Sequence, residues 1–273
     1  NMKYNFSVLI SIYKKNKLKE VKELFKSIDH QSFQPNEIII IFDGLVLNEI
    51  KEFIKKKKID KIIQNIKNYG LGYSLRKGVL LSKNNLILRC DADDINLRDR
   101  FKILYKKIIS DKSLDVVGSY QLEILKDRKY LKHVPQNHNK IKRILPYRNC
   151  INHPTVIFRK KSIIRSGNYR NVGIFFDCNN FEDYYLWLRV MKHNYKFHNI
   201  KKILVISKIN TSFYERRWGK NILKNYEKFL KLSYKNNLIN YFQLIINLIL
   251  RKILYNLSSK KFILIFKFFR NKI

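Results

Sequence analysis

The feature that most constrains the fold is the alternation of two hydrophobic periods over the first 120 residues. Short apolar runs, rich in isoleucine, alternate with longer stretches whose apolar residues recur every three to four positions. The short runs predict buried strands, and the longer stretches predict amphipathic helices. Strands that alternate with helices form a parallel sheet with crossover helices. The sequence therefore predicts an α/β fold.

The pattern gives approximate bounds for this first half. Strands are expected at Phe6–Tyr13, Glu37–Phe42, Ile59–Ile66, Asn85–Cys90 and Leu114–Val117. Helices are expected at Lys17–His30, Leu47–Lys58, Gly72–Ser82 and Leu97–Ser110. Because a helix connects each strand to the next, we expect the carboxyl ends of the strands to meet at one edge of the sheet.

The alternation weakens after Ser119, and a mixed second half of the sheet fits this part of the sequence. Further strands are expected at Tyr120–Leu125, Lys129–Val134, Thr155–Arg159 and Ile203–Ser207. Helices are expected at Asn139–Leu145 and Glu182–Asn194. We therefore predict one mixed α/β domain over residues 1–218.

The last 55 residues, Gly219–Ile273, differ from the rest in composition. They contain 12 Lys and Arg and one acid, Glu227, among three long apolar stretches. The longest uncharged run, Asn236–Leu250, has 15 residues, whereas a helix needs about 20 to span a bilayer. We therefore predict basic amphipathic helices that lie on an anionic membrane surface. The alternative is a helical subdomain that packs on the main domain and keeps its lysines in water.

The whole chain is strongly basic, because 57 Lys and Arg against 21 Asp and Glu give a formal net charge of +36. Such a charge indicates a polyanionic partner. One alternative is a non-catalytic nucleic-acid-binding protein, which would interleave basic and aromatic residues on one surface. Here the excess charge is concentrated in the apolar C-terminal segment, and the scarce acids stand at strand ends. We therefore expect no nucleic-acid partner.

The three cysteines, at positions 90, 150 and 178, are far apart and form no CxxC pair. This usage predicts a reduced, cytoplasmic compartment. The first apolar run, Phe6–Tyr13, has the length of a strand and lacks the pattern of a signal peptide.

Three of the few acids, Asp91, Asp93 and Asp94, directly follow the predicted strand Asn85–Cys90. Open α/β sheets bind ligands at the carboxyl ends of their strands. Carboxylate oxygens suit Mg²⁺ or Mn²⁺, which keep open positions for phosphate oxygens. The alternative for one member is helix capping, with Asp94 or Asn96 as N-cap of the next helix.

Two further segments are candidates for binding a nucleotide. Asp43 ends the apolar run IIIIFDG at another strand's carboxyl end, although Asp-Gly is also a common turn. The segment Asn68–Gly78 brings three glycines to a helix start, where backbone amides, Arg76 and Lys77 could contact a diphosphate. A tight turn between strand and helix is the alternative there.

Glu182 and Asp183 stand in the first turn of an aromatic-rich predicted helix. Acids in a first turn commonly only complement the helix dipole. The same dipole would keep a carboxylate ionised near neutral pH, as a general base requires.

Six segments, in this order and spacing, resemble the inverting glycosyltransferases of family 2. They are FSVLISIYKK, SIDHQSFQPNEIIIIFDG, NYGLGYSLRKG, RCDADDINLRDRF, INHPTVIFRK and NFEDYYLWLRV. The resemblance covers roughly residues 4–218. It is greatest to the branch that builds bacterial capsule, exopolysaccharide and lipopolysaccharide O-chains.

The resemblance implies a GT-A fold, which is a Rossmann-like mixed sheet flanked by helices, and a nucleotide-sugar donor, expected to be a UDP-sugar. By position in the motifs, Ser11 and Tyr13 would line the nucleotide pocket, and Asp43 would face the base. Arg76 falls in the glycine-turn segment and is expected near the diphosphate.

The resemblance also implies a divalent metal, Mn²⁺ or Mg²⁺, and a catalytic base. Asp91 and Asp93 match the family's DxD motif, with Asp93 as the expected metal ligand and Asp91 near the ribose and the metal. Asp183 matches the second acid of the family's ED pair, the catalytic base.

The function expected from this resemblance is transfer of a hexose or N-acetylhexosamine to a lipid-linked saccharide. The enzyme would work at the inner face of the cell membrane as a peripheral protein. A nucleotidyltransferase, which would share the sheet and the acid cluster, attacks phosphorus instead of a sugar carbon and is the enzymatic alternative.

Overall fold

The computed structural model describes residues 5–126, 128–170, 181–209, 220–258, 261, 264–265 and 271–272. Its strands are β1 (Ser7–Ile12), β2 (Glu37–Phe42), β3 (Lys61–Gln64), β4 (Leu86–Asp91), β5 (Asp94–Asn96), β6 (Leu114–Leu125), β7 (Arg128–Lys132), β8 (Ile157–Arg159), β9 (Lys196–Ile209) and β10 (Asn271–Lys272). Within these residues they form one ten-stranded sheet in the order β10-β7-β6-β8-β4-β1-β2-β3. Strand β9 pairs with β6 and also with β5.

The helices include those that the periodicity predicts, in the same order, and one further short helix, α6, that it does not predict. They are α1 (Leu18–Asp29), α2 (Asn48–Lys55), α3 (Leu71–Leu81), α4 (Arg100–Ser110), α5 (His138–Ile144), α6 (Lys160–Arg165), α7 (Glu182–Lys192), α9 (Lys220–Lys235) and α10 (Tyr241–Asn256), with a 3₁₀ turn, η1, at His153–Thr155. The strands β3, β2, β1 and β4 pair in parallel. The other pairs of the sheet are antiparallel, except that β6 and β9 are parallel. The predicted mixed α/β sheet is therefore confirmed.

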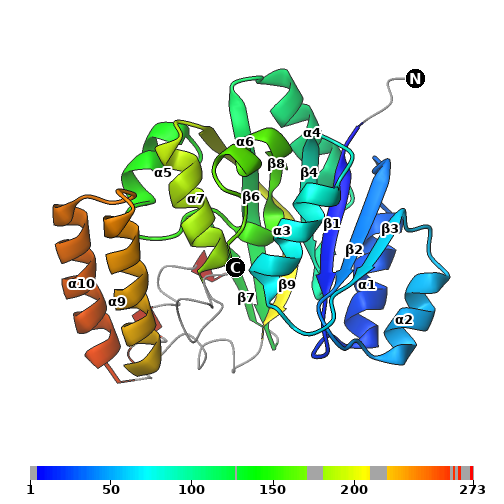
Figure 1. Cartoon of the computed structure of the whole chain (residues 1–273), viewed down its shortest axis with the longest axis horizontal. Helices are drawn as coiled ribbons and strands as arrows, with labels where there is room; N and C mark the ends of the chain where they lie inside the picture. The colour runs from blue at the N-terminus through cyan, green and yellow to red at the C-terminus, as the bar shows by residue number, and fades with distance from the viewer. Residues whose placement is uncertain are drawn as a thin grey trace.

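The sheet separates two hydrophobic cores, because successive side chains of a strand point to opposite faces. Leu9 of β1 packs with Val79 of α3 and with α7 on one face. Its neighbours Val8 and Ile10 pack with α1, α2 and, through Phe101, α4 on the other face. Figure 1 shows α3 and α7 on the near side of the sheet.

Strand β6 differs from the prediction, which placed two strands at Leu114–Val117 and Tyr120–Leu125 with a break between them. The strand is continuous from 114 to 125. A Cβ at Gly118 would lie 2.5 Å from Oδ1 of Asn199 on β9, so glycine is needed there for close packing between strands. The pairing of β6 with β9 shifts register on either side of Tyr120. The sequence pattern changes at this point because the pairing is irregular, although the strand itself does not end.

The capping alternative for the acid cluster is wrong. Asp94 and Asn96 belong to the short strand β5, in which Asp94 pairs with Ser207 of β9. Helix α4 begins later, at Arg100, with Asp99 at the N-cap position. The local sequence favours a cap, but pairing with a strand more than a hundred residues away decides the structure.

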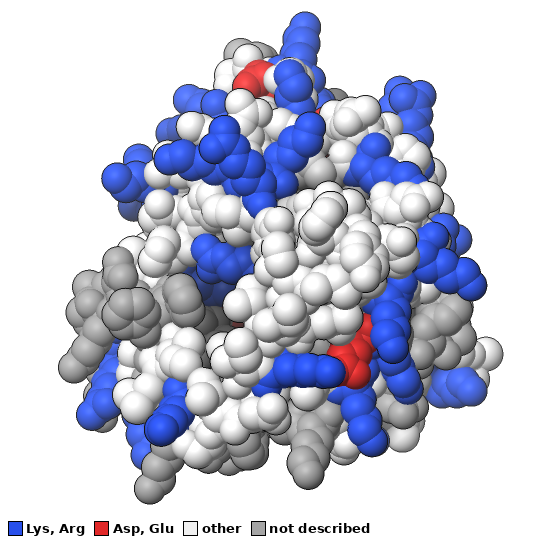
Figure 2. Space-filling view, turned by 90° about the vertical axis from the view of Figure 1, so that its left-hand side faces the viewer, with Lys and Arg blue, Asp and Glu red and all other residues white. Residues whose placement is uncertain are grey.

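The C-terminal helices α9 and α10 pack against each other at one end of the molecule, at the left of Figure 1. Phe229, Leu230, Ile239 and Leu244 join the core that α7 also lines. The outer side of this hairpin, seen in Figure 2, carries a largely uncharged surface with Lys and Arg around it. No helix among the described residues is long and apolar enough to cross a bilayer. The predicted boundary between residues 218 and 219 lies outside the described residues.

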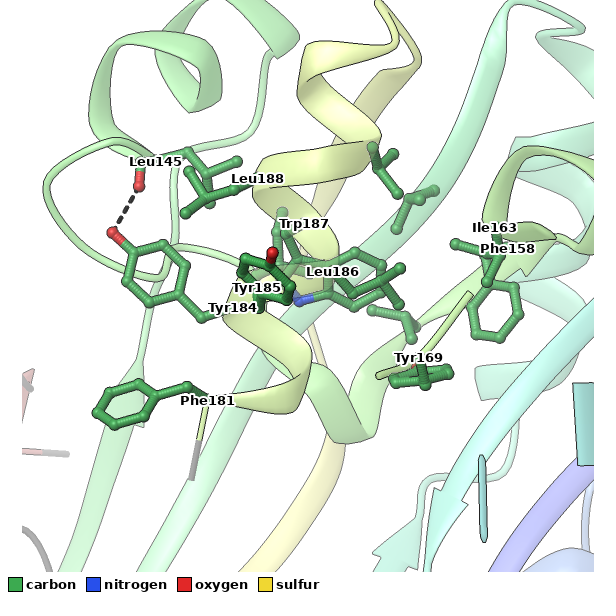
Figure 3. Close-up of a cluster of buried hydrophobic side chains, with 14 of the residues drawn as sticks. Leu145, Phe158, Ile163, Tyr169, Phe181, Tyr184, Tyr185, Leu186, Trp187 and Leu188 are labelled. Carbon is green, nitrogen blue, oxygen red and sulfur yellow. Dashed lines mark hydrogen bonds between the residues drawn. The ribbon is translucent and has the colours of Figure 1, made fainter. Parts of the chain in front are cut away.

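Helix α7 is almost completely buried, and its aromatic side chains fill the space between the sheet and α9. Figure 3 shows Tyr184 donating its hydroxyl hydrogen to the carbonyl oxygen of Leu145, at 2.7 Å. The ring of Phe181, just before the helix, stacks on Phe229 of α9 with 4.7 Å between ring centroids. The side chain of Trp187, also on α7, is fully buried. Aromatic packing therefore fixes the position of the first turn of α7.

Because Phe229 of α9 is buried against the start of α7, removing its ring should cost much stability. Phe229→Ala is expected to lower the free energy of unfolding by about 3–5 kcal/mol, the usual cost of removing a buried phenylalanine ring. Phe242→Ala is the matched control, because Phe242 is 76% exposed on α10 and its removal should change stability by less than about 0.5 kcal/mol. Urea unfolding of both variants measures the difference, and equal values would contradict the packing described.

Candidate active site

The carboxyl ends of β1, β2 and β4 bring several of the predicted residues to one edge of the sheet. Ser11 of β1 lies between Ile41 of β2 and Asp91 of β4 in the strand register. Asp43 follows β2, and its backbone N–H donates to the carbonyl oxygen of Ile12, at 2.8 Å. Tyr13, the next residue after Ile12, therefore lies near Asp43. The predicted meeting of the strand ends at one edge of the sheet is confirmed.

Asp43 is buried and organises the loop that precedes α3. Its Oδ1 accepts hydrogen bonds from the backbone of Tyr69, at 2.9 Å, and from Nδ2 of Asn65, at 3.1 Å. Its Oδ2 accepts from the backbone of Gly70, also at 2.9 Å. Gly70 has a φ of 90°, which favours glycine. The carboxylate thus ties the end of β2 to the glycine-rich turn, while its role toward a nucleotide stays a prediction.

Arg76 is exposed on α3 and reaches the segment that follows α6. Its Nη1 lies 3.4 Å from each of the carbonyl oxygens of Gly167 and Tyr169, to which it donates. The structure places Arg76 beside Arg170 and Arg189, whose charges act on one another. The predicted contact of Arg76 with a diphosphate stays a prediction.

Arg89, which the sequence analysis did not single out, lies at the centre of the site. It precedes Asp91 by two positions on β4, so both side chains point to the face that α7 covers. Arg89 is 2% exposed and forms an ion pair with Oδ1 of Asp91. Its Nε and Nη1 have no hydrogen-bond partner in the part of the chain that the structure describes. Buried polar groups without partners are rare and commonly mark functional sites.

The acids after β4 crowd together at the same edge. Asp93 is exposed, but partial desolvation of its carboxyl, and then the negative charge of Asp91, raise its pKa to about 6. The same two causes, together with Asp93, raise the pKa of Asp94 well above its usual range. Asp94 is buried, and its Oδ2 has no hydrogen-bond partner among the described residues. These raised pKa values mean that the cations of the protein do not fully compensate the acids gathered at this edge.

This donor set fits a divalent cation that binds together with a phosphorylated substrate. Asp91 and Asp93 offer carboxylate oxygens at the mouth of the site, and Mg²⁺ is commonly held by one or two carboxylates plus substrate phosphates. No group of three or more His, Cys, Asp or Glu among the described residues could hold a metal ion by itself. The residues present therefore suit a metal ion whose remaining ligands come from the substrate, and they do not suit a metal site closed by protein ligands alone.

Asp183 is held in the first turn of α7 by two hydrogen bonds. Its Oδ2 accepts from Nδ2 of Asn149, at 2.8 Å, and its Oδ1 accepts from the backbone N–H of Tyr184, at 2.7 Å. Burial raises the pKa of Asp183, while these two hydrogen bonds and the charge of Arg89 oppose the rise. The neighbouring Glu182 is more strongly affected, since burial and the charge of Asp183 raise its pKa to about 8.

The electrostatic contacts of Arg89 join the two acid sites. Its charge acts on Asp91, Tyr169, Asp94 and Asp183, so acids at the end of β4 and in the first turn of α7 are within electrostatic reach of this guanidinium. The hydroxyl of Tyr169 forms a hydrogen bond of 2.8 Å with Nε2 of His153 at the floor of the site. Asp91 and Asp183, predicted separately from the sequence, thus both interact with one buried cation.

The motif RCDADD contains the only sequence signal that could have indicated Arg89. An arginine in an otherwise apolar buried strand requires an anionic partner, and Asp91 stands two positions away on the same face. The sequence does not show that α7 covers this face, so the contribution of Arg89 to Asp183 could not be predicted.

A protein-family model matches more than half of the chain. The family model described as "Glycosyl transferase family 2" matches residues 7–167. The chain belongs to glycosyl transferase family 2. The match to the family model includes Asp43, Asp91 and Asp93 and ends before Asp183.

Three curated glycosyltransferases are similar to this chain over most of its length and agree with the family assignment. The chain is 32% identical over 252 residues to the UDP-Gal:alpha-D-GlcNAc-diphosphoundecaprenol beta-1,3-galactosyltransferase of Escherichia coli, covering 90% of this chain and 89% of the relative. It is 29% identical to the amylovoran biosynthesis glycosyltransferase AmsE of Erwinia amylovora, covering 84% and 85%. It is also 29% identical to the O-antigen biosynthesis glycosyltransferase WbnJ of Escherichia coli, covering 81% and 84%.

Solved structures of other glycosyltransferases share the fold of this family member. TarS of S. aureus, residues 1–349, solved in complex with UDP-GlcNAc, superposes with a TM-score of 0.61 at 16% identity, covering 94% of this chain and 69% of that one. The mannosyltransferase PcManGT of Pyrobaculum calidifontis, in complex with GDP-Man and Mn²⁺, gives 0.59 at 10% identity, covering 84% and 64%. The predicted GT-A fold is confirmed.

Proposed function

We propose that the chain is an inverting, metal-dependent glycosyltransferase. It transfers a hexose or N-acetylhexosamine from a UDP-sugar to a lipid-diphosphate-linked saccharide during synthesis of a bacterial surface polysaccharide. The observation that carries this proposal is that buried Arg89 pairs with Asp91 and that its charge also acts on Asp183. The E. coli relative, named for transfer of galactose to GlcNAc-diphosphoundecaprenol, supports the choice of acceptor.

The donor would bind at the carboxyl edge of β1, β2 and β4. Ser11 and Tyr13 would line the nucleotide pocket, Asp43 would face the base, and Arg76 would approach the diphosphate. Asp93, with Asp91, would hold Mn²⁺ or Mg²⁺, which supplies positive charge to stabilise the departing nucleoside diphosphate.

Asp183 would take the proton of the acceptor hydroxyl while the acceptor oxygen attacks the anomeric carbon. Nδ2 of Asn149 and the backbone N–H of Tyr184 orient the carboxylate by occupying one lone pair on each oxygen. The remaining lone pairs are the basic positions. Arg89 stabilises the ionised form of Asp183, because its charge lowers the pKa of this carboxyl. A single displacement with one base inverts the anomeric carbon and needs no covalent nucleophile.

The role of Asn149 gives a pH-dependence test of this mechanism. A base must be ionised, so turnover should fall as the pH drops through the raised pKa of Asp183. Asn149→Ala removes a hydrogen bond that lowers this pKa, and the acidic limb of the turnover profile should therefore move to higher pH. Asn139→Ala, at an exposed position on α5, is the control and should leave the profile in place. An unmoved profile for Asn149→Ala would contradict the assignment of Asp183 as base.

To identify the donor, we propose to screen nucleotide sugars, each with Mn²⁺, for thermal stabilisation of the chain. A ligand that binds only the folded state raises the apparent stability of that state. The expected hit is a UDP-sugar, and UDP should be released when acceptor is added. Release of pyrophosphate from a nucleoside triphosphate would instead indicate a nucleotidyltransferase.

A further inference from the structure

Helix α10 turns two polar side chains, Asn247 and Arg251, toward the protein. Nδ2 of Asn247 donates to the carbonyl oxygen of Pro146, at 3.0 Å. Nη2 of Arg251 donates to the carbonyl oxygen of Tyr147, at 3.1 Å, and to the hydroxyl of Tyr226, at 3.0 Å. These contacts fix the rotation of α10 about its axis, because each pairs a side chain of one helix face with a defined group of the domain.

The opposite face of α10 is apolar and exposed. It consists of five side chains at helical spacing, which we call the outer face: Phe242, Ile246, Ile249, Leu250 and Ile253. Their exposed fractions are 76%, 43%, 53%, 53% and 60%. A helix between protein and water normally shows the reverse pattern. A contiguous exposed apolar surface of this kind marks a site that another surface covers.

Helix α9, packed beside α10, adds a row of positive charge. Lys224, Lys228, Lys231 and Lys235 recur at helical spacing and are all exposed. Residues 220–258 contain one acid, Glu227, against seven Lys and Arg. Figure 2 shows the uncharged surface of this side with Lys and Arg along its borders.

We propose that the outer face of α10 inserts into the headgroup region of an anionic lipid bilayer. The helix would lie in the membrane plane while the lysine row of α9 contacts lipid phosphates. Apolar side chains and flanking cations together are what interfacial helices use for binding. A second copy of this chain is less suited to cover the outer face. Docking of one outer face on another would bring two rows of lysines together, and these would repel each other.

The proposal rests on the proposed function, since it gives the lipid-linked acceptor a surface on which to meet the enzyme. Phe229 of α9 stacks on Phe181, the residue before Glu182 and Asp183. The hairpin therefore connects the membrane-facing side directly to the first turn of α7, which carries the proposed base.

The test measures co-sedimentation of the full chain with phosphatidylcholine vesicles, with and without phosphatidylglycerol. The wild type should bind the anionic vesicles and lose affinity as salt rises. A triple variant, Phe242→Ser with Ile249→Ser and Ile253→Ser, should bind them at least about tenfold more weakly. The matched control, Leu80→Ser with Ile109→Ser and Ile164→Ser, removes exposed apolar side chains of other helices and should bind like the wild type.

A second variant keeps the test decisive if the first does not fold. Lys224→Gln with Lys228→Gln and Lys231→Gln changes only exposed side chains and should flatten the salt dependence of binding. Absence of wild-type binding to anionic vesicles would overturn the proposal, as would unchanged binding by a folded outer-face variant. A wild-type dimer that the outer-face variant converts to monomer, without vesicle binding, would show that a second copy covers this face. Transfer to a short-chain acceptor in solution reports on the proposed function separately, because it needs no bilayer.

Discussion

Asp183→Asn is expected to lower turnover by about 10²–10⁴-fold, the usual contribution of general base catalysis, while donor and Mn²⁺ affinity stay unchanged. The asparagine side chain is nearly isosteric, and its carbonyl oxygen can still accept one of the two hydrogen bonds that hold the carboxylate. It cannot take the proton of the acceptor hydroxyl. Calorimetry of donor binding and assays of UDP release on the same variant separate the two effects.

A purely structural role for Asp183 predicts a different result. An acid that only complements the dipole of α7 would cost at most about 1 kcal/mol of stability and leave turnover nearly intact. Asp115→Asn is the matched control, because Asp115 accepts a hydrogen bond from the backbone of Lys196, at 2.9 Å, outside the site. An Asp183→Asn enzyme as active as this control would remove the proposed mechanism.

Asp93→Ala is expected to abolish both metal-dependent donor binding and turnover. Its carboxylate is the proposed metal ligand at the edge of the sheet, and a catalytic metal ion is worth several kcal/mol of transition-state stabilisation. Turnover should therefore fall by about 10³-fold or more. Unlike Asp183→Asn, this variant should also lose the thermal stabilisation that donor and Mn²⁺ together give the wild type.

Chelation provides an independent check of the Asp93 prediction. EDTA should reduce the wild type to the activity of Asp93→Ala and should have no further effect on the variant. Asp99→Ala is the control, because Asp99 is an exposed acid at the start of α4 that accepts a hydrogen bond from Oγ of Ser32, at 2.6 Å. A fully active Asp93→Ala enzyme, or a wild type that EDTA does not inhibit, would contradict the proposed metal site.

The parallel half of the sheet could be predicted because its signals are local. Strand β2 occupies Glu37–Phe42 as expected, since five consecutive apolar residues between polar neighbours can only be buried as a strand of this length. Helix α7 likewise begins at Glu182, where the acids and the aromatic pattern place it. The meeting of Ser11 with Asp91 follows from parallel pairing alone.

The remaining features depend on partners distant in sequence. Strand β5 exists because Asp94 pairs with Ser207, although its three residues favour a helix cap locally. Arg89 could be placed on a strand, but its electrostatic interaction with Asp183 requires α7 to cover that face of the sheet. The inward polar face of α10 depends on carbonyl oxygens of the loop at Pro146, which periodicity does not reveal.

The most direct test of the proposed mechanism is the anomeric configuration of the product. The full chain is incubated with Mn²⁺, the donor found in the screen and a GlcNAc-diphospho-lipid, and the new glycosidic linkage is examined by nuclear magnetic resonance. We expect transfer of one sugar with release of UDP and an anomeric configuration opposite to that of the donor. A product that retains the donor's configuration would contradict the single displacement with Asp183 as base. Failure to transfer sugar to any lipid-diphosphate acceptor would contradict the proposed reaction itself.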